Sequence, residues 1–177
     1  MRSFVAVLAV LVAVALLQPS SVAQGKKSSA AQNKMLVKKA YGWFNSNSWD
    51  SLETVIAPDY IEHDPDQGQK PGFDGLKAQF QQYTATFPDM KMDMKEIAAD
   101  GDMVLTRVVV TGTMKGKMGD LPPNGKKMEV EMFEQLRINN GVMVERWGVF
   151  DSMKMMAQLG LMPPPDAPKD EMDLGLP

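Results

Sequence analysis

The sequence predicts an α+β domain in which helices pack on one face of a curved antiparallel sheet. Up to Phe87, apolar residues recur at helical spacing. After Pro88 the period of the apolar residues changes to two, in four runs that turn signals separate. Helices followed by a meander of strands are typical of an α+β domain, whereas helices that alternate with strands would indicate a parallel sheet.

The first half of the domain contains three expected helices. Residues 33–47 predict a helix with a lysine-rich outer face and an apolar stripe made of Leu36, Val37, Ala40, Trp43 and Phe44. Asp50 is the expected N-cap of a short helix over residues 51–56, which Pro58 ends. The segment "APDYIEHDPDQGQKPG" then predicts a short extended piece and a Pro/Gly loop. Residues 72–87 predict the third helix, with Leu76, Phe80, Tyr83 and Phe87 on one side.

The second half predicts four strands: "MKMDMKEIAAD", "MVLTRVVVTGTMKG", "KKMEVEMFEQLRIN" and "GVMVERWGVFD". Asn140-Gly141, between the last two runs, is the clearest hairpin turn. Residues 152–159 predict a final helical turn. In the third run, one face carries Glu134 among the apolar residues Met128, Val130, Met132, Leu136 and Ile138, so this face is expected to point inward.

Charged residues at these strands are candidate site residues. Glu134 is expected to be a buried acid, either as a second pocket carboxylate or as the partner of Arg107 pointing inward. The pair is favoured, because an unpaired buried charge costs several kcal/mol. In the last run, alternation places Glu145, Trp147 and Asp151 on one surface, which we expect to face a pocket. The alternative role for Asp151 is the N-cap of the helix that follows.

The N-terminus predicts export. One arginine, an apolar run over residues 4–17 and the small residues Ser21-Val22-Ala23 form the pattern of a signal peptide over residues 1–23. An uncleaved anchor is the alternative, although the run is shorter than the roughly 20 residues of a membrane span. We expect a flexible lead over 24–32, one domain over 33–162 and a disordered, Pro-rich acidic tail over 163–177, with no membrane association after cleavage.

The composition excludes several classes of site. The chain has no cysteine and one histidine, so disulfides, thiol nucleophiles and multi-histidine metal sites are excluded, and no metal is expected. Removal of the signal peptide leaves 18 basic against 22 acidic residues, which argues against nucleic-acid binding. The alternating Met90, Met92 and Met94 could bind Cu(I), but core-facing strand residues are the favoured explanation.

Four segments together resemble the SnoaL-like polyketide (ester) cyclases of the nuclear transport factor 2-like superfamily. They are "YIEHDP", "FDGLKAQFQQYTATFPDM", "GDMVLTRVVVTGTMKGKMGDLPPNGKKMEV" and "GVMVERWGVFDSMKMMAQLG". The resemblance implies a cone, in which a curved antiparallel sheet wraps around helices and encloses a pocket. It also implies homodimers that pair through the open face of the sheet.

The resemblance implies catalytic roles for Asp151 and His63. His63 would be a hydrogen-bond donor or proton relay in the pocket, and the alternative is a loop residue bonded to the backbone. Asp151 matches the acid/base of an intramolecular aldol ring closure that uses neither metal nor cofactor, and Trp147 matches a pocket tryptophan. The first hypothesis is therefore an exported, cofactor-free enzyme that acts on a small apolar carbonyl compound. The alternative is a non-enzymatic carrier or sensor of a small hydrophobic molecule, which the export signal favours. Met114 stands where members of the family often have a histidine, and this difference also favours the carrier or sensor.

Overall fold

A computed structural model describes residues 28–162 of the 177-residue chain. The predicted signal peptide, residues 24–27 of the lead and the predicted tail lie outside the described residues. The elements follow in the order α1 (Ala30–Asn45), α2 (Trp49–Glu53), β1 (Ile56–Glu62), α3 (Gly72–Thr86), β2 (Lys91–Asp100), β3 (Met103–Thr113), β4 (Lys127–Asn139), β5 (Val142–Phe150) and α4 (Ser152–Gln158). Within residues 28–162, none of the helices has the length and apolar character to cross a bilayer.

The helix boundaries differ from expectation at two N-termini. Helix α1 begins at Ala30 because Ser29 and Gln32 form a capping box that satisfies free amide groups of the first turn. Helix α2 has Ser48 as its N-cap residue, and Asp50 lies in the first turn instead of capping it. A carboxylate there still interacts favourably with the positive end of the helix dipole.

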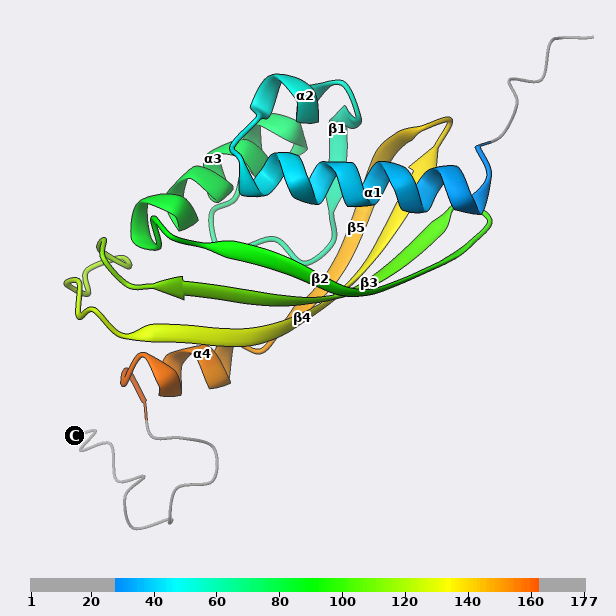
Figure 1. The fold of residues 1–177 in the computed structure, drawn as a ribbon. Coiled ribbons are helices and arrows are strands. Elements are labelled where there is room, and N and C mark those ends of the chain that lie inside the picture. The colour runs from blue at the N-terminus through cyan, green and yellow to red at the C-terminus, as the bar shows by residue number, and fades with distance from the viewer. Residues whose placement is uncertain (1–27, 163–177) are drawn as a thin grey trace, which may run out of the picture.

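The sheet has the strand order β1-β5-β4-β3-β2 (Figure 1). Strands β2 to β5 form the predicted antiparallel meander, and β1 adds to its edge by pairing in parallel with β5. Asn140 and Gly141 have φ angles of 50° and 82°, which the tight turn between β4 and β5 requires. The hairpin prediction is therefore confirmed.

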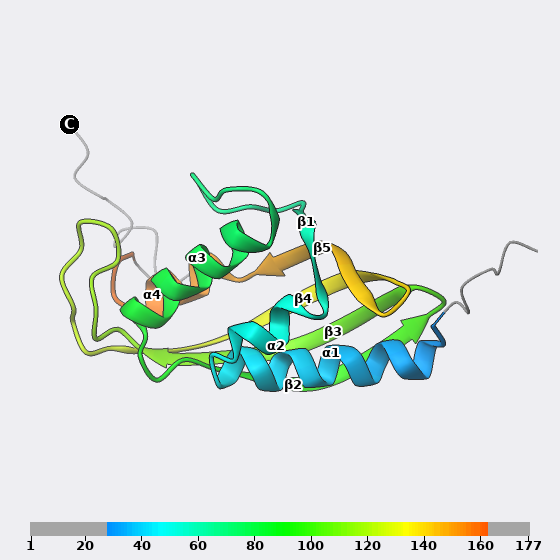
Figure 2. The same cartoon turned by 90° about the horizontal axis from the view of Figure 1, so that it is seen from above.

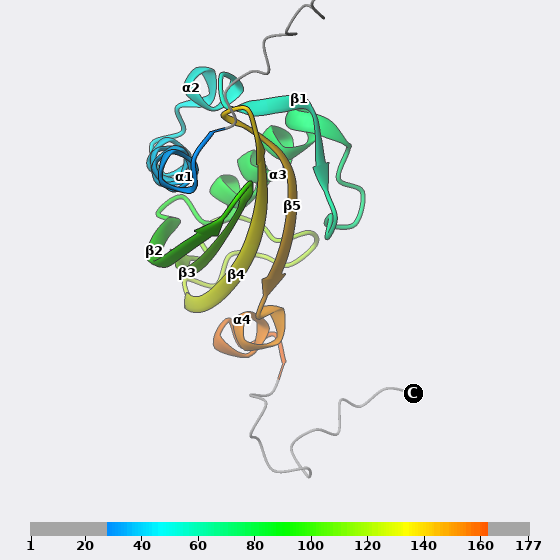
Figure 3. The same cartoon turned by 90° about the vertical axis from the view of Figure 1, so that its right-hand side faces the viewer.

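Helices α1 and α3 cover the inner face of the curved sheet, and α4 lies along the edge of β4, where Gln158 donates to the carbonyl of Glu129 at 3.1 Å. Helix α1 packs on β2 and β3, α3 packs beside β1, and α4 packs on β4 (Figure 3). The segment between β3 and β4 lies beside the C-terminal end of α3 (Figure 2), where the Thr86 hydroxyl donates to the carbonyl of Lys117 at 2.7 Å. The α+β cone expected from the sequence is confirmed.

Side-chain alternation places the predicted apolar residues of the central strands in the core. The inner face of β4 buries Met128, Val130, Met132, Glu134, Leu136 and Ile138, as predicted. Met92 is buried, and Met90 and Met94 pack partly buried against the same core. These three methionines are therefore core residues of the sheet.

Strand β5 departs from simple alternation. The pairing between β4 and β5 shifts between Arg137 and Ile138, opposite the stretch from Met143 to Glu145. Met143 is buried, and after the shift Arg146, Gly148 and Phe150 point inward and line the interior cavity. Counting by two along the sequence could not detect this irregularity.

Candidate functional site

A cavity of about 360 Å³ lies between helices α1 and α3 and the inner face of the sheet. Its walls are mostly apolar, and seven of the residues that line it are methionines. Asp64, Asp66 and Tyr83 line the cavity and are also exposed, so they mark its mouth. This volume and this lining are typical of sites for small molecules.

An ion-pair network built around Arg146 occupies the wall of the cavity. Its Nη1 lies 2.8 Å from a carboxylate oxygen of Glu62, and its Nε donates to Glu134. The second oxygen of Glu134 accepts from the hydroxyl of Thr106 at 3.3 Å, and Tyr41 reaches the same hydroxyl at 3.4 Å. The network joins four elements, α1, β1, β3 and β4, to β5.

Strand register explains why these side chains meet. Glu62 is the partner of Arg146 in the parallel pair of β1 and β5, and Glu134 lies between Thr106 on β3 and Gly148 on β5. Gly148 leaves room here, because a methyl group on it would push the guanidinium of Arg146 out of this position. The absence of a side chain thus leaves room for the buried cation.

Burial and charge shift the pKa values in this network. Burial alone would lower the pKa of Arg146, but the negative charges of Glu134 and Glu62 outweigh it and raise that pKa above its usual range. Burial, together with the charge of Glu62, raises the pKa of Tyr60. Arg146 therefore stays positively charged and Tyr60 neutral at any physiological pH.

Asp66 is one of two carboxylates of the cavity, with Asp64, that form no ion pair among the described residues. Asp66 is exposed, but its Oδ2 points to α3. There the side-chain amide of Gln79 donates to Oδ2 at 2.8 Å, and the hydroxyl of Tyr83 donates to the same oxygen. Both donors bind Oδ2, so Oδ1 has no hydrogen-bond partner among the described residues. Burial raises the pKa of Asp66, and the positive charge of Arg146 opposes this only in part.

Glu134 lies in the cavity wall, but the predicted pair with Arg107 is wrong. Arg107 points to the outer face of the sheet and binds Glu96 and Glu131, at 2.8 and 2.6 Å. Thr106 takes the inner position instead, because it is the residue of β3 directly opposite Glu134. Alternation along β3 therefore assigns Arg107 to the solvent side.

His63, Glu145 and Trp147 lie together, but outside the cavity lining. The imidazole of His63 stacks on Trp147 with 4.2 Å between ring centroids, and its Nε2 is 3.1 Å from Glu145. Arg137 lies 5.7 Å from the Trp147 ring and 3.3 Å from Glu145. The three predicted residues thus form a cluster that links the end of β1 to β5 on the outer face. Trp147 and Glu145 do not line the interior cavity, because the irregular pairing in β5 makes Arg146 and Gly148 the inner residues, and Trp147 lines the outer face of the sheet. A substrate-binding role for the two residues stays a prediction.

Asp151 is exposed and caps helix α4. Its carboxylate accepts from the backbone N–H of Lys154 at 2.9 Å, and it is not part of the cavity lining. This is the capping role weighed as the alternative from the sequence. Catalysis by Asp151 remains a prediction that the resemblance alone supports.

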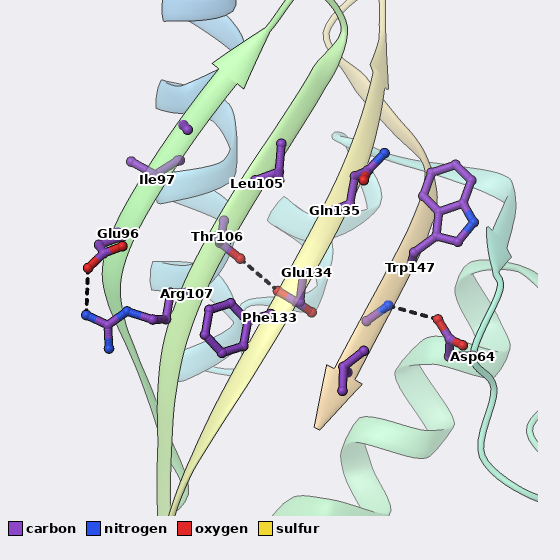
Figure 4. Close-up of a pocket in the computed structure, with 13 residues that line it drawn as sticks. Asp64, Glu96, Ile97, Leu105, Thr106, Arg107, Phe133, Glu134, Gln135 and Trp147 are labelled. Carbon is purple, nitrogen blue, oxygen red and sulfur yellow. Dashed lines mark hydrogen bonds and ion pairs between the residues drawn. The ribbon is translucent and has the colours of Figure 1, made fainter. Parts of the chain in front are cut away.

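The outer face of the sheet carries a second, open groove of about 650 Å³ (Figure 4). Leu105, Phe133 and Trp147 lie along it, and Asp64 reaches its edge, where it accepts from the N–H of Gly148 at 2.9 Å. The groove is larger than the interior cavity but follows an exposed face. An exposed apolar groove of this kind is more typical of a contact with another protein than of a binding site for a small ligand.

Sequence reasoning missed Arg146, Glu62, Asp64 and Asp66. The only signal for Arg146 was a positive charge two residues before a glycine in a mostly apolar strand, and the acids of "EHDPD" lie in a segment predicted to be a short extended piece and a loop. Within residues 28–162, no group of three or more histidine and acidic side chains is arranged to hold a metal ion.

A curved antiparallel sheet wrapped around helices, with a cavity between the two, defines a cone of the nuclear transport factor 2-like class. Within this class, the chain belongs to the SnoaL-like polyketide cyclase family, whose model matches residues 34–159. No curated protein sequence matches the chain.

Solved structures agree with this assignment. IdmH from Streptomyces antibioticus, a putative polyketide cyclase, is 34% identical with a TM-score of 0.66, over 73% of this chain and 99% of that chain. AclR from Streptomyces galilaeus, a putative hydroxylase, is 26% identical with a TM-score of 0.69, over 80% of this chain and 88% of that chain. TsrD from Streptomyces laurentii shares the fold at 20% identity, with a TM-score of 0.69, over 76% of this chain and 99% of that chain.

Proposed function

We propose that the chain catalyses cofactor-free acid/base chemistry, of the aldol ring-closure type, on a small apolar carbonyl compound bound in the interior cavity. The carboxyl of Asp66 carries this proposal, because it lies at the mouth of an apolar cavity, keeps one oxygen free and has a raised pKa. A base with these properties can both accept and return a proton near its working pH.

The proposed reaction needs one group that first accepts a proton and later donates it. The Asp66 carboxylate removes a proton from the carbon between two carbonyl groups, which leaves an enolate. The enolate carbon forms a bond to the carbon of a third carbonyl group in the same molecule, whose oxygen becomes an alkoxide. The carboxyl group of Asp66 then returns the proton to this oxygen, so that substrate and product are isomers.

A carrier or sensor would use the same cavity, since a fold does not determine its function. Incubation of the full chain with a test compound that carries a β-dicarbonyl unit and a third carbonyl group, followed by mass spectrometry and absorbance, separates the enzyme from the carrier. Formation of an isomer supports the enzyme. Binding of the compound without any conversion by the unmodified protein identifies a carrier instead.

We also propose that the protein is exported after cleavage before Gln24. The apolar run over residues 4–17, followed by Ser21-Val22-Ala23, supports this. Expression of the full chain in a bacterial host is expected to yield a periplasmic or secreted product whose first residue is Gln24. N-terminal sequencing checks it, and a product that still begins with Met1 contradicts the prediction.

We propose further that two copies pair through the outer groove. Leu105, Phe133 and Val149 expose 49%, 52% and 72% of their surface there. Light scattering at micromolar concentration is expected to give twice the chain mass. The change Phe133→Asp should give a monomer, because it would bury a carboxylate in the interface. Met35→Asp, at an exposed position on α1, is the control. A monomeric unmodified protein contradicts the proposal.

A further inference from the structure

The charged groups that line the interior cavity are strongly unbalanced. Glu62, Asp64, Asp66 and Glu134 contribute four carboxylates, and Arg146 is the one cation among the lining residues. Glu62 and Glu134 bind this cation at Nη1 and Nε, so two carboxylates already offset its charge. With the acids ionised, a ligand in the cavity meets a surplus of negative charge.

The two acids without an ion-pair partner in the described part of the chain lie at the mouth of the cavity. These are Asp64 and Asp66, which are exposed, whereas Glu62 and Glu134 hold Arg146 in the wall. The seven methionines of the wall adapt to different shapes and make favourable contacts with aromatic rings. The cavity thus offers a flexible apolar compartment with an acidic entrance.

From this charge distribution we infer that the cavity selects apolar molecules whose polar end is a hydrogen-bond donor or a cation, such as a hydroxyl, an enol or an ammonium group, and rejects carboxylates. The free Oδ1 of Asp66 accepts a hydrogen bond from such a group. A carboxylate ligand would instead face like charges in a partly desolvated site, where repulsion is stronger than in water. The inference rests on the proposed use of the cavity as the binding site.

Three compounds with the same ring system test the selectivity: 1-naphthylmethylamine, 1-naphthylmethanol and 1-naphthoic acid. Their dissociation constants for the full chain are measured by calorimetry at pH 7 and low salt. We expect the amine to bind at least about tenfold more tightly than the acid, with the alcohol between them. The double change Asp64→Asn and Asp66→Asn should reduce this ratio several-fold, whereas Asp59→Asn, an exposed acid outside the lining, should preserve it.

Two further variants locate the binding. Leu76→Trp fills the interior cavity and should abolish binding of the amine, while Leu105→Trp, in the outer groove, should leave it unchanged. Equal binding of all three compounds, or tighter binding of the acid, overturns the charge selectivity. In that case the cavity is still a binding site, and the proposed function is unaffected. If none of them binds, or if only Leu105→Trp prevents binding, the proposed use of the cavity is overturned as well.

Discussion

Replacement of Asp66 by asparagine is expected to slow turnover of a β-dicarbonyl compound roughly 10²- to 10⁴-fold. Asparagine keeps the shape of the side chain and an oxygen that can accept from Gln79 and Tyr83, but it cannot take up a proton. Because the folded protein raises the pKa of Asp66, ionisation of this group opposes folding above that pKa. The neutral replacement should therefore leave the melting temperature unchanged or slightly higher.

The same residue predicts the pH dependence of the reaction. Only ionised Asp66 can act as the base, so kcat/KM should fall as the pH is lowered through the raised pKa of this carboxyl. The acidic limb of the pH profile is expected above the ordinary aspartate value of 3.8. A profile whose acidic limb lies below that value contradicts the assignment.

Asp151→Asn is the matched control, because it makes the same chemical change at an acid outside the cavity. Asparagine caps helices almost as well as aspartate, so both stability and turnover should be retained. Asp151→Ala should cost about 0.5 to 2 kcal/mol of unfolding free energy through loss of the cap. If Asp151→Asn abolishes turnover and Asp66→Asn does not, the acid/base is Asp151, as the family resemblance implies, and the assignment to Asp66 is wrong.

Replacement of Arg146 by methionine is expected to destabilise the fold by about 3 to 5 kcal/mol. Only 19% of the Arg146 side chain is exposed, and its loss leaves Glu62 and Glu134 as uncompensated carboxylates with 9% and 7% of their side-chain surface exposed. Urea unfolding followed by circular dichroism measures the effect.

Arg107→Met is the control for this change. Arg107 also binds two glutamates, but Glu96 and Glu131 are open to solvent, with 69% and 49% of their side chains exposed. Water screens such pairs, so the unfolding curve should hardly move. If Arg146→Met does not fold, the triple change with Glu62→Gln and Glu134→Gln should recover folded protein. If Arg146→Met and Arg107→Met lower the unfolding free energy equally, burial of the ion pairs does not explain their contribution to stability, which would falsify this prediction.

Much of the fold could be predicted from local patterns. The change of apolar period after Pro88 separated the helical half from the sheet, and Asn140-Gly141 identified a hairpin whose backbone needs positive φ angles. The inner face of β4, with Glu134 among apolar residues, also followed from alternation. These features depend on neighbours in the chain, so the sequence by itself contains the information.

The composition of the site depended on the tertiary structure. Glu62 meets Arg146 only because β1 adds to the sheet in parallel beside β5, although the two residues are 84 positions apart. The irregular pairing in β5 turned Trp147 outward and Arg146 inward, which periodicity could not reveal. The sequence by itself determined the order of elements, the core face and the family resemblance. Only the tertiary structure decided which acids face the cavity, because strand pairing and register depend on contacts between distant segments and not on local pattern.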